Sequence, residues 1–273
     1  MNTHRAFLLL ATLAATPALG QTVAPAPGGS ATPAAASIPD FSGVWAHPSW
    51  PSVEPPLSGP GPVRNRSRLR TGESNGSQLV GDYTNPILRP HAAEVVKKYG
   101  EISQKGVTYP TPANQCWPQP VPYIFWTIGI QILQQPDKVT ILYSNPDHEA
   151  RQVRLNQPHP PKVTPSWYGD SVGHYEGDTL VVDTIGQNAR TPVDPFRTPH
   201  TEKLHVVERW RMVDGGKAME AVFTVDDVGA FYQPWTAMRR YRRIDQDFVE
   251  KICAENNTNL FDYHIPVANK ADF

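Results

Sequence analysis

The sequence has few of the features that build metal, redox or nucleotide sites. It contains only two cysteines in 273 residues and no C-x-x-C motif, which argues against a thiolate zinc site and a redox dithiol. It also lacks an H-E-x-x-H motif, a phosphate-binding glycine loop and a dinucleotide fingerprint. We therefore expect neither a bound metal nor a cofactor.

Charge of one sign is not in excess either. Lys and Arg number 25, Asp and Glu number 26, and the one local basic cluster is the group of arginines within residues 239–243. Nucleic-acid binding usually needs a broad basic surface, so this balance argues against a nucleic-acid partner.

Long apolar runs are absent except near the start of the chain. Met1–Gly20 has the form of a secretory signal peptide, with Arg5, the apolar run Ala6–Ala11 and small residues before a predicted cleavage at Gln21. The run is shorter than the ~20 apolar residues of a transmembrane helix. We expect a periplasmic or secreted protein with no integral membrane segment after signal removal.

The mature chain divides into two parts. Residues 21–38 are rich in Ala, Pro, Gly and Ser and predict a disordered linker, whereas residues 39–273 fit a single domain. In an exported protein the pair Cys116 and Cys253 suggests a disulfide, and two free buried thiols are the alternative.

Strand signals outnumber helix signals in a chain with 29 prolines. One helix is predicted over Pro90–Gly100, and residues 51–89 predict a long irregular loop. The β-rich runs, most of them separated by turn signals, are Phe41–His47, Tyr123–Leu133, Val139–Tyr143, Gln152–Leu155, Ser171–Tyr175, Thr179–Ile185, Leu204–Met212, Ala218–Val225, Thr236–Tyr241 and Phe248–Cys253. They predict an all-β antiparallel meander that closes as a barrel, with a two-sheet sandwich as runner-up.

The first predicted strand contains Gly43-Val44-Trp45, which resembles the G-x-W that opens many lipocalin-type (calycin) barrels. In those barrels the Trp fills the closed end and an Arg from a late strand packs across its ring. The resemblance implies that an arginine within 239–243 supplies this cation–π contact.

The segment from Trp167 to Thr184 predicts a hairpin with Glu176-Gly177 as its two-residue loop. In that register Asp170 lies opposite Asp183 and His174 opposite Thr179. Side chains alternate along strands, so these four share one face. Two facing carboxylates repel unless one is protonated or a cation lies between them.

The same segment resembles a signature of secreted bacterial proteins of unassigned function, with the core G-D-S-x-G-x-(Trp/Tyr)-E-G-D-T-L-V-V-D-T. The other matching pieces are His159-Pro160, Pro199-His200-Thr201, Glu208-Arg209 and Cys253–Asn257. The likeness spans residues 116–257. It implies an exported location and no particular reaction.

A second hairpin is predicted over Leu204–Val225 with Gly215-Gly216 as its loop, which places Glu208 opposite Phe223. Glu208 is the one charged residue on an otherwise apolar face, whereas the other face carries charged pairs. Glu208 should therefore project into the interior, where burial raises the pKa of a carboxyl unless a cation is near.

These placements give a candidate catalytic set. Glu208 is expected to act as general acid or base, with His200 from the preceding loop as the second proton-transfer group and Arg154 stabilising a developing anion. The alternative is an internal ion pair of Glu208 with Arg154 or Arg239, which would make the glutamate structural.

Five further residues are expected to line the binding pocket: His159, Trp167, Asp170, His174 and Asp183. A metal site is the alternative use of these side chains. Zinc or iron could bind to His159, His174, His200, Asp170 and Asp183, although these residues lack metal-site spacing. A G-x-S-x-G match at residues 169–173 precedes a hairpin rather than a helix, which excludes a serine-hydrolase elbow.

Two functions are consistent with these features. The first is a cofactor-free lyase, isomerase or hydrolase that acts on a small hydrophobic or aromatic molecule by general acid–base catalysis. The second is a non-catalytic periplasmic carrier of a small hydrophobic ligand. An inward carboxyl with nearby histidines favours the enzyme, because a carrier gains little from desolvated polar groups.

Overall fold

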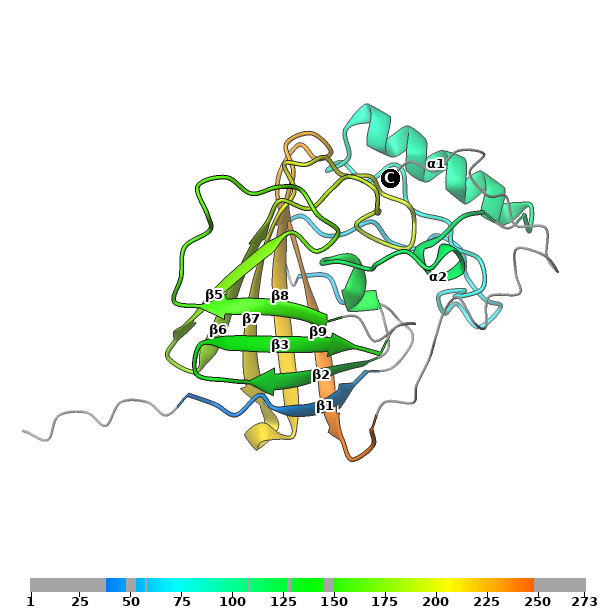
Figure 1. Cartoon of the computed structure of the whole chain (residues 1–273). Helices are drawn as coiled ribbons and strands as arrows, with labels where there is room; N and C mark the ends of the chain where they lie inside the picture. Colours follow the sequence, from blue (N-terminus) through cyan, green and yellow to red (C-terminus); the bar gives the residue numbers. More distant parts are fainter. Residues whose placement is uncertain are drawn as a thin grey trace, which may run out of the picture. The chain divides into compact units, whose positions relative to one another are not determined.

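The computed structural model describes residues 38–47, 53–56, 58–107, 109–126, 129–144 and 150–247 (Figure 1). The predicted signal peptide, residues 21–37 of the predicted linker, and the strand predicted over Phe248–Cys253 lie outside these ranges. Cys253 also lies outside the described ranges, so its disulfide with Cys116 stays a prediction.

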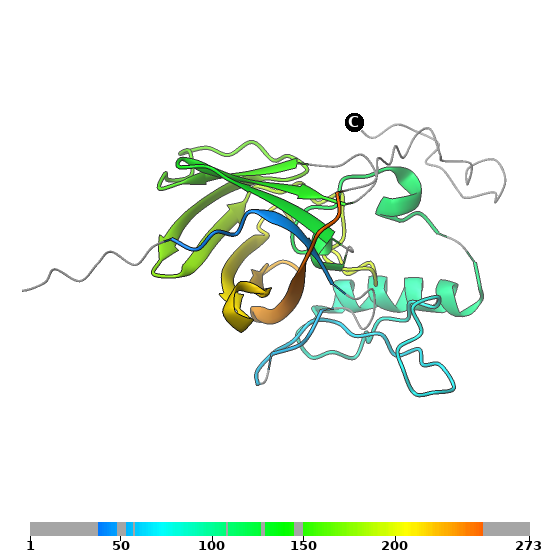
Figure 2. The ribbon, with the colours of Figure 1, turned by 90° about the horizontal axis from the view of Figure 1, so that it is seen from below.

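Nine strands form one closed barrel, in which each strand pairs with the next and the last pairs with the first (Figures 1 and 2). They are β1 (Gly43–Ala46), β2 (Gly129–Gln134), β3 (Lys138–Tyr143), β4 (Ala150–Leu155), β5 (Asp170–Glu176), β6 (Thr179–Ile185), β7 (His205–Val213), β8 (Ala218–Asp226) and β9 (Trp235–Ile244). The closure confirms the predicted all-β barrel. It excludes the two-sheet sandwich, which would leave open edges.

The prediction of a purely antiparallel meander is wrong at one position. Strands β4 and β5 pair in parallel, with Val153 opposite Ser171 and Leu155 opposite Gly173. A parallel pair needs a connection that returns along the length of the strands. Residues 156–169 form this crossover, and they run outside the sheet in Figure 1.

Helix α1 (Pro90–Gln104) confirms the predicted helix but extends past its expected end at Gly100. A Cβ on Gly100 would lie 3.3 Å from the Val80 side chain, so this glycine allows close packing inside the helix rather than ending it. A short helix α2 (Pro112–Gln115) begins with a capping box between Thr111 and Asn114. Among the described residues, no helix is long and apolar enough to span a membrane.

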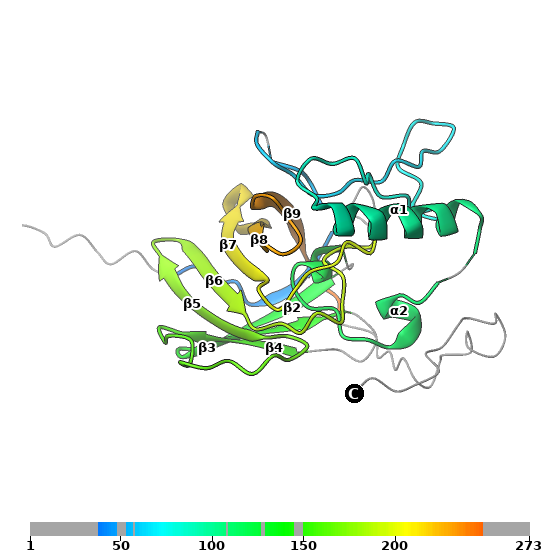
Figure 3. The same cartoon turned by 90° about the horizontal axis from the view of Figure 1, so that it is seen from above.

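Helices α1 and α2 lie with the irregular segment 58–88 at one end of the barrel, which we call the mouth (Figure 3). The strand predicted over Tyr123–Leu133 is in fact a 3₁₀ turn, η1 (Tyr123–Trp126), followed by β2. Pro120 and Pro122 fix the backbone just before this turn and disfavour a continuous strand. The turn inserts Phe125 into the barrel, where its ring stacks on Phe223 at 4.1 Å between centroids.

The expected contact between Trp45 and an arginine within residues 239–243 is present. Trp45 is fully buried, and its Nε1–H donates to the Phe41 carbonyl at 2.9 Å. The Arg243 guanidinium lies 4.4 Å from the centre of the Trp45 ring. Gly43 has a φ of +122°, and a Cβ there would lie 2.5 Å from Arg243 Nη1, so the arginine reaches the tryptophan over a glycine.

Candidate functional site

Glu208 lies inside the barrel, as its strand pattern predicts. The β7–β8 register places it opposite Phe223, and its side chain is fully buried. Its carboxylate accepts two hydrogen bonds from Arg151, at 2.5 Å from Nη2 to Oε1 and 3.2 Å from Nη1 to Oε2. Trp210 Nε1–H donates to the same Oε2 at 3.0 Å.

Arg151 is buried as fully as its partner and is held from several strands. Its Nε donates to Ser171 Oγ at 3.0 Å, Nη2 to Thr184 Oγ1 at 3.2 Å and Nη1 to Tyr143 OH at 3.3 Å. Burial lowers and the charge of Glu208 raises the pKa of Arg151, with a net rise. The guanidinium therefore stays charged and ties β3, β5, β6 and β7 to β4.

This arrangement corrects the predicted catalytic role of Glu208. Its partner is Arg151 rather than Arg154 or Arg239, and the pair is bidentate. A carboxylate held by three donors in a packed interior has no oxygen directed at a substrate. This geometry matches the alternative expectation, an internal ion pair of Glu208 with an arginine, and gives no support to a catalytic role.

The β5–β6 hairpin turns one residue later than predicted, at Gly177–Asp178, because Glu176 pairs with Thr179. Asp170 consequently lies opposite Ile185, and Asp183 lies opposite Val172, so the two aspartates do not face each other directly. The shift moves the cross-strand partner of each residue by two positions along the neighbouring strand. It therefore leaves both aspartates on the same outer face of the barrel.

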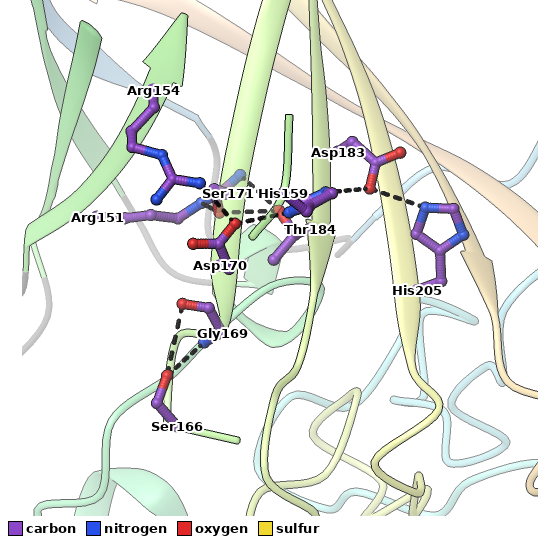
Figure 4. Close-up of polar contacts among 10 residues, drawn as sticks. All are labelled: Arg151, Arg154, His159, Ser166, Gly169, Asp170, Ser171, Asp183, Thr184 and His205. Carbon is purple, nitrogen blue, oxygen red and sulfur yellow. Dashed lines mark hydrogen bonds and ion pairs between the residues drawn. The ribbon is translucent and has the colours of Figure 1, made fainter. Parts of the chain in front are cut away.

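Four of the predicted site residues meet on this outer wall, and His205 from β7 joins them (Figure 4). His159 Nδ1 lies 2.6 Å from Asp170 Oδ1, and its Nε2 lies 3.1 Å from Asp183 Oδ1. Arg154 Nη2 donates to Asp170 at 2.9 Å, and His205 Nε2 lies 2.9 Å from Asp183 Oδ1. We call these five residues the wall cluster.

His159 lies between the two carboxylates, with Nδ1 next to Asp170 and Nε2 next to Asp183. His159 thereby fastens the 156–169 crossover to β5 and β6. The position of Arg154 in this cluster corrects its predicted role as anion stabiliser beside Glu208, which lies inside the barrel.

The remaining predicted binding residues lie elsewhere on the surface. His174 is exposed and contacts Glu176 at 3.1 Å, at the far end of β5. The ring of Trp167 lies 5.5 Å from the Arg190 guanidinium. Neither contact joins the wall cluster.

His200 lies at the mouth, in the β6–β7 connection that spans residues 186–204 and that we call the mouth loop. It is buried, and its Nδ1 lies 2.8 Å from the Thr201 carbonyl. Burial lowers the pKa of His200, and nearby backbone carbonyls and Asp227 oppose this effect only in part. The imidazole is therefore neutral at pH 7 and donates through Nδ1.

The mouth loop also holds a buried carboxyl that the sequence did not single out. Asp194 is 1% exposed, and its Oδ1 accepts from the backbone N–H groups of Phe196 at 2.9 Å and Thr198 at 3.1 Å. Burial raises the pKa of Asp194 to about 6, although these hydrogen bonds and the charge of Arg197 act in the opposite direction.

Arg197 lies between two aromatic rings from other parts of the mouth. Its guanidinium is 4.9 Å from the Tyr99 ring of α1 and 5.8 Å from the ring of Trp117. Its Nη1 is shielded from solvent and has no hydrogen-bond partner among the described residues. A buried guanidinium nitrogen without an acceptor is costly, which makes this group a candidate for ligand binding.

Within the described ranges, no group of three or more His, Cys, Asp or Glu side chains is arranged to hold a metal ion. Comparisons with protein-family models, with curated proteins and with solved structures find no match for this chain.

Proposed function

We propose that this chain is an exported, cofactor-free enzyme that acts on a small hydrophobic or aromatic molecule by general acid–base catalysis at the mouth loop. The observation that carries the proposal is that one loop holds both the buried Asp194 carboxyl and a buried Arg197 nitrogen that has no partner among the described residues. Acid–base sites need such a titrating group beside a fixed cation.

The two groups would have complementary roles. A carboxyl with a pKa near 6 can both accept and return a proton close to neutral pH. Arg197 would stabilise the negative charge that develops on a substrate oxygen when Asp194 removes a neighbouring proton. The rings of Tyr99 and Trp117 flank the Arg197 guanidinium and hold it in place. A guanidinium held in this way supports the proposed role of Arg197 in stabilising an anion on a planar substrate.

His200 keeps its proposed place as second proton-transfer group, in a narrower form. Its Nδ1 contacts the Thr201 carbonyl, and the Thr191 backbone also hydrogen-bonds the imidazole, so a substrate that exchanges a proton with His200 would have to replace one of these contacts. Together these groups fit a lyase, an isomerase or a hydrolase.

A carrier is the second candidate, because the unpartnered Arg197 nitrogen would also bind a carboxylate or carbonyl oxygen without chemistry. In that case Asp194 would only cap the backbone of its own loop. The two candidates therefore differ in what they require of the Asp194 proton.

Solvent deuterium exchange tests the proposal. The full chain would be incubated in D₂O with a panel of small aromatic and hydrophobic carbonyl compounds, and NMR would follow deuterium uptake and product formation. Asp194→Asn keeps an acceptor for the loop N–H groups but cannot take up a proton, so it should abolish turnover. Arg197→Gln should weaken it by roughly 10²–10³-fold.

Glu202→Gln, in an exposed position of the same loop, is the matched control and should leave turnover unchanged. Turnover that persists in Asp194→Asn would contradict the enzyme proposal. Ligand broadening without turnover, lost in Arg197→Gln and kept in Asp194→Asn, would establish the carrier instead.

A further inference from the structure

A cavity lies between the irregular segment that precedes α1 and the η1 turn, and a role for it is independent of the proposed mouth-loop chemistry. The cavity has a volume of about 170 Å³. This is smaller than the ~300–1,000 Å³ pockets that hold drug-sized molecules, so it fits a single ring with a small substituent. Its lining residues are Val53, Pro55, Pro62, Val63, Arg64, Asn65, Arg68, Ser74 and Trp126.

Prolines, valines and a tryptophan form the apolar part of the lining. Pro55, Pro62 and the buried Val63 come from the irregular segment, and Trp126 comes from η1. An isolated bridge between Glu54 and Met238 ties the segment's start to β9. A planar aromatic ring is the ligand shape that prolines and an indole ring bury well.

Trp126 provides the first polar contact. Its Nε1–H is shielded from solvent and has no acceptor among the described residues. Buried indole N–H groups usually find a partner, because a buried donor without one costs about as much as a lost hydrogen bond. A ligand oxygen in the cavity would supply that partner.

The polar part of the lining is positive. Arg64 and Arg68 both line the cavity, and neither forms an ion pair within the described part of the chain. Arg68 Nη1 donates to the backbone carbonyls of Asn65 and Ser67, which holds its guanidinium against the cavity wall. Among the described residues that line the cavity, none has a carboxylate to balance the two cations.

We propose that this cavity binds a small aromatic carboxylate. Its ring would pack on Trp126 and the two prolines, and its carboxylate would contact Arg64 and Arg68. Arginine binds a carboxylate through charge-assisted hydrogen bonds, which are roughly twice as strong as neutral ones. The described lining residues between Val53 and Ser74 would thus serve as the wall of a ligand site.

The test uses benzoate as the probe and the full chain labelled with ¹⁵N, with the indole N–H signals followed by NMR. Benzoate should shift the Trp126 signal, assigned through its loss in Trp126→Phe. Benzamide keeps the ring without the charge and acetate keeps the charge without the ring, so both should bind at least about tenfold more weakly.

Arg64→Gln changes an exposed side chain and should weaken benzoate binding about tenfold with the fold intact. Arg70→Gln lies in the same segment but outside the cavity lining, and it should bind benzoate as the wild type does. Equal affinities for benzoate and benzamide, or equal weakening by the two arginine variants, would overturn the proposal. A benzoate response at Trp117 alone would overturn it too and assign the carboxylate to the mouth loop.

Discussion

Replacing Glu208 with glutamine should destabilise the barrel strongly, because it leaves the Arg151 cation buried without its counter-charge. Arg151 is 2% exposed, and its other contacts are the hydroxyl groups of Ser171, Thr184 and Tyr143, which carry no charge. Removing one partner of a buried ion pair costs about 3–5 kcal/mol. That is a large part of the ~5–15 kcal/mol by which a typical domain is stable.

A double-mutant cycle separates the buried charge from the loss of packing. Arg151→Met alone should cost a similar amount, whereas Arg151→Met with Glu208→Leu should recover most of it, because a well-packed apolar pair can replace a buried ion pair. The recovery should fall short by about 1–3 kcal/mol, since Trp210 Nε1–H loses its acceptor in the double variant.

Urea unfolding followed by tryptophan fluorescence measures each free energy of unfolding. Arg211→Gln is the matched control, because Arg211 pairs with Glu220 across the same hairpin but is 57% exposed, and it should cost at most about 1 kcal/mol. A free energy of unfolding for Glu208→Gln within about 1 kcal/mol of the wild-type value would contradict the buried-charge explanation. So would a loss of stability in the double variant equal to the sum of the losses in Glu208→Leu and Arg151→Met.

Three further predictions concern other charged groups. Asp194→Asn should flatten the pH dependence of the free energy of unfolding between about pH 4 and 6. The raised pKa of the Asp194 carboxyl stabilises the fold below the unfolded-state pKa of 3.8, and this stabilisation, roughly 3 kcal/mol, is lost as the pH rises through about 6. If the urea midpoints of Asp194→Asn depended on pH as those of the wild type do, the assignment would be contradicted. The Asp183–His205 pair should stabilise the fold between about pH 4 and 6.5. The pKa of Asp183 is lowered, so its contribution is lost on acidification, and the pKa of His205 is raised, so its contribution is lost on alkalinisation. His205→Gln should therefore lower the free energy of unfolding by a few tenths of a kcal/mol at pH 5.5, and an equal loss at pH 8.5 would count against the pair. Arg243→Gln should cost about 0.5–1 kcal/mol by thermal unfolding through loss of its contact with Trp45, and a wild-type melting temperature would show that the contact contributes nothing.

The two predicted hairpins show how far alternation in a sequence determines register. The β7–β8 pairing is confirmed with Glu208 opposite Phe223, because only one register places apolar residues on one face and charged pairs on the other. In β5–β6 both Glu176-Gly177 and Gly177-Asp178 are plausible two-residue turns. The choice between them changes the partners without changing the faces, so hydrophobic pattern alone does not decide it.

The partner of Glu208 was missed for a related reason. The predicted strand Gln152–Leu155 starts after Arg151, whereas β4 begins at Ala150. Parity within β4 places Arg151, Val153 and Leu155 on the buried face and Arg154 on the outer one. A strand boundary two residues earlier would have identified the correct arginine from the sequence.

The mouth loop could not be predicted in this way. Asp194 and Arg197 belong to an irregular segment without periodicity, and their environment comes from residues distant in the chain, such as Tyr99 of α1. The sequence predicts that His200 lies in a loop before β7, and the structure places it in the β6–β7 connection. Its burial, which lowers its pKa, depends on tertiary packing.

The distribution of polar groups explains why the proposed chemistry belongs to the mouth loop rather than to the barrel interior. The interior ion pair is satisfied by hydrogen bonds from neighbouring strands, so it fixes the wall and has nothing left to offer a substrate. The mouth loop is also held firmly, since Phe196 packs against Gly81 and Asp227 accepts from Thr201 N–H and Oγ1–H. Yet it keeps a buried nitrogen of Arg197 that has no acceptor in the part of the chain that the structure describes. A rigid loop that leaves one strong donor unsatisfied is preorganised for an anion or oxyanion that arrives from outside.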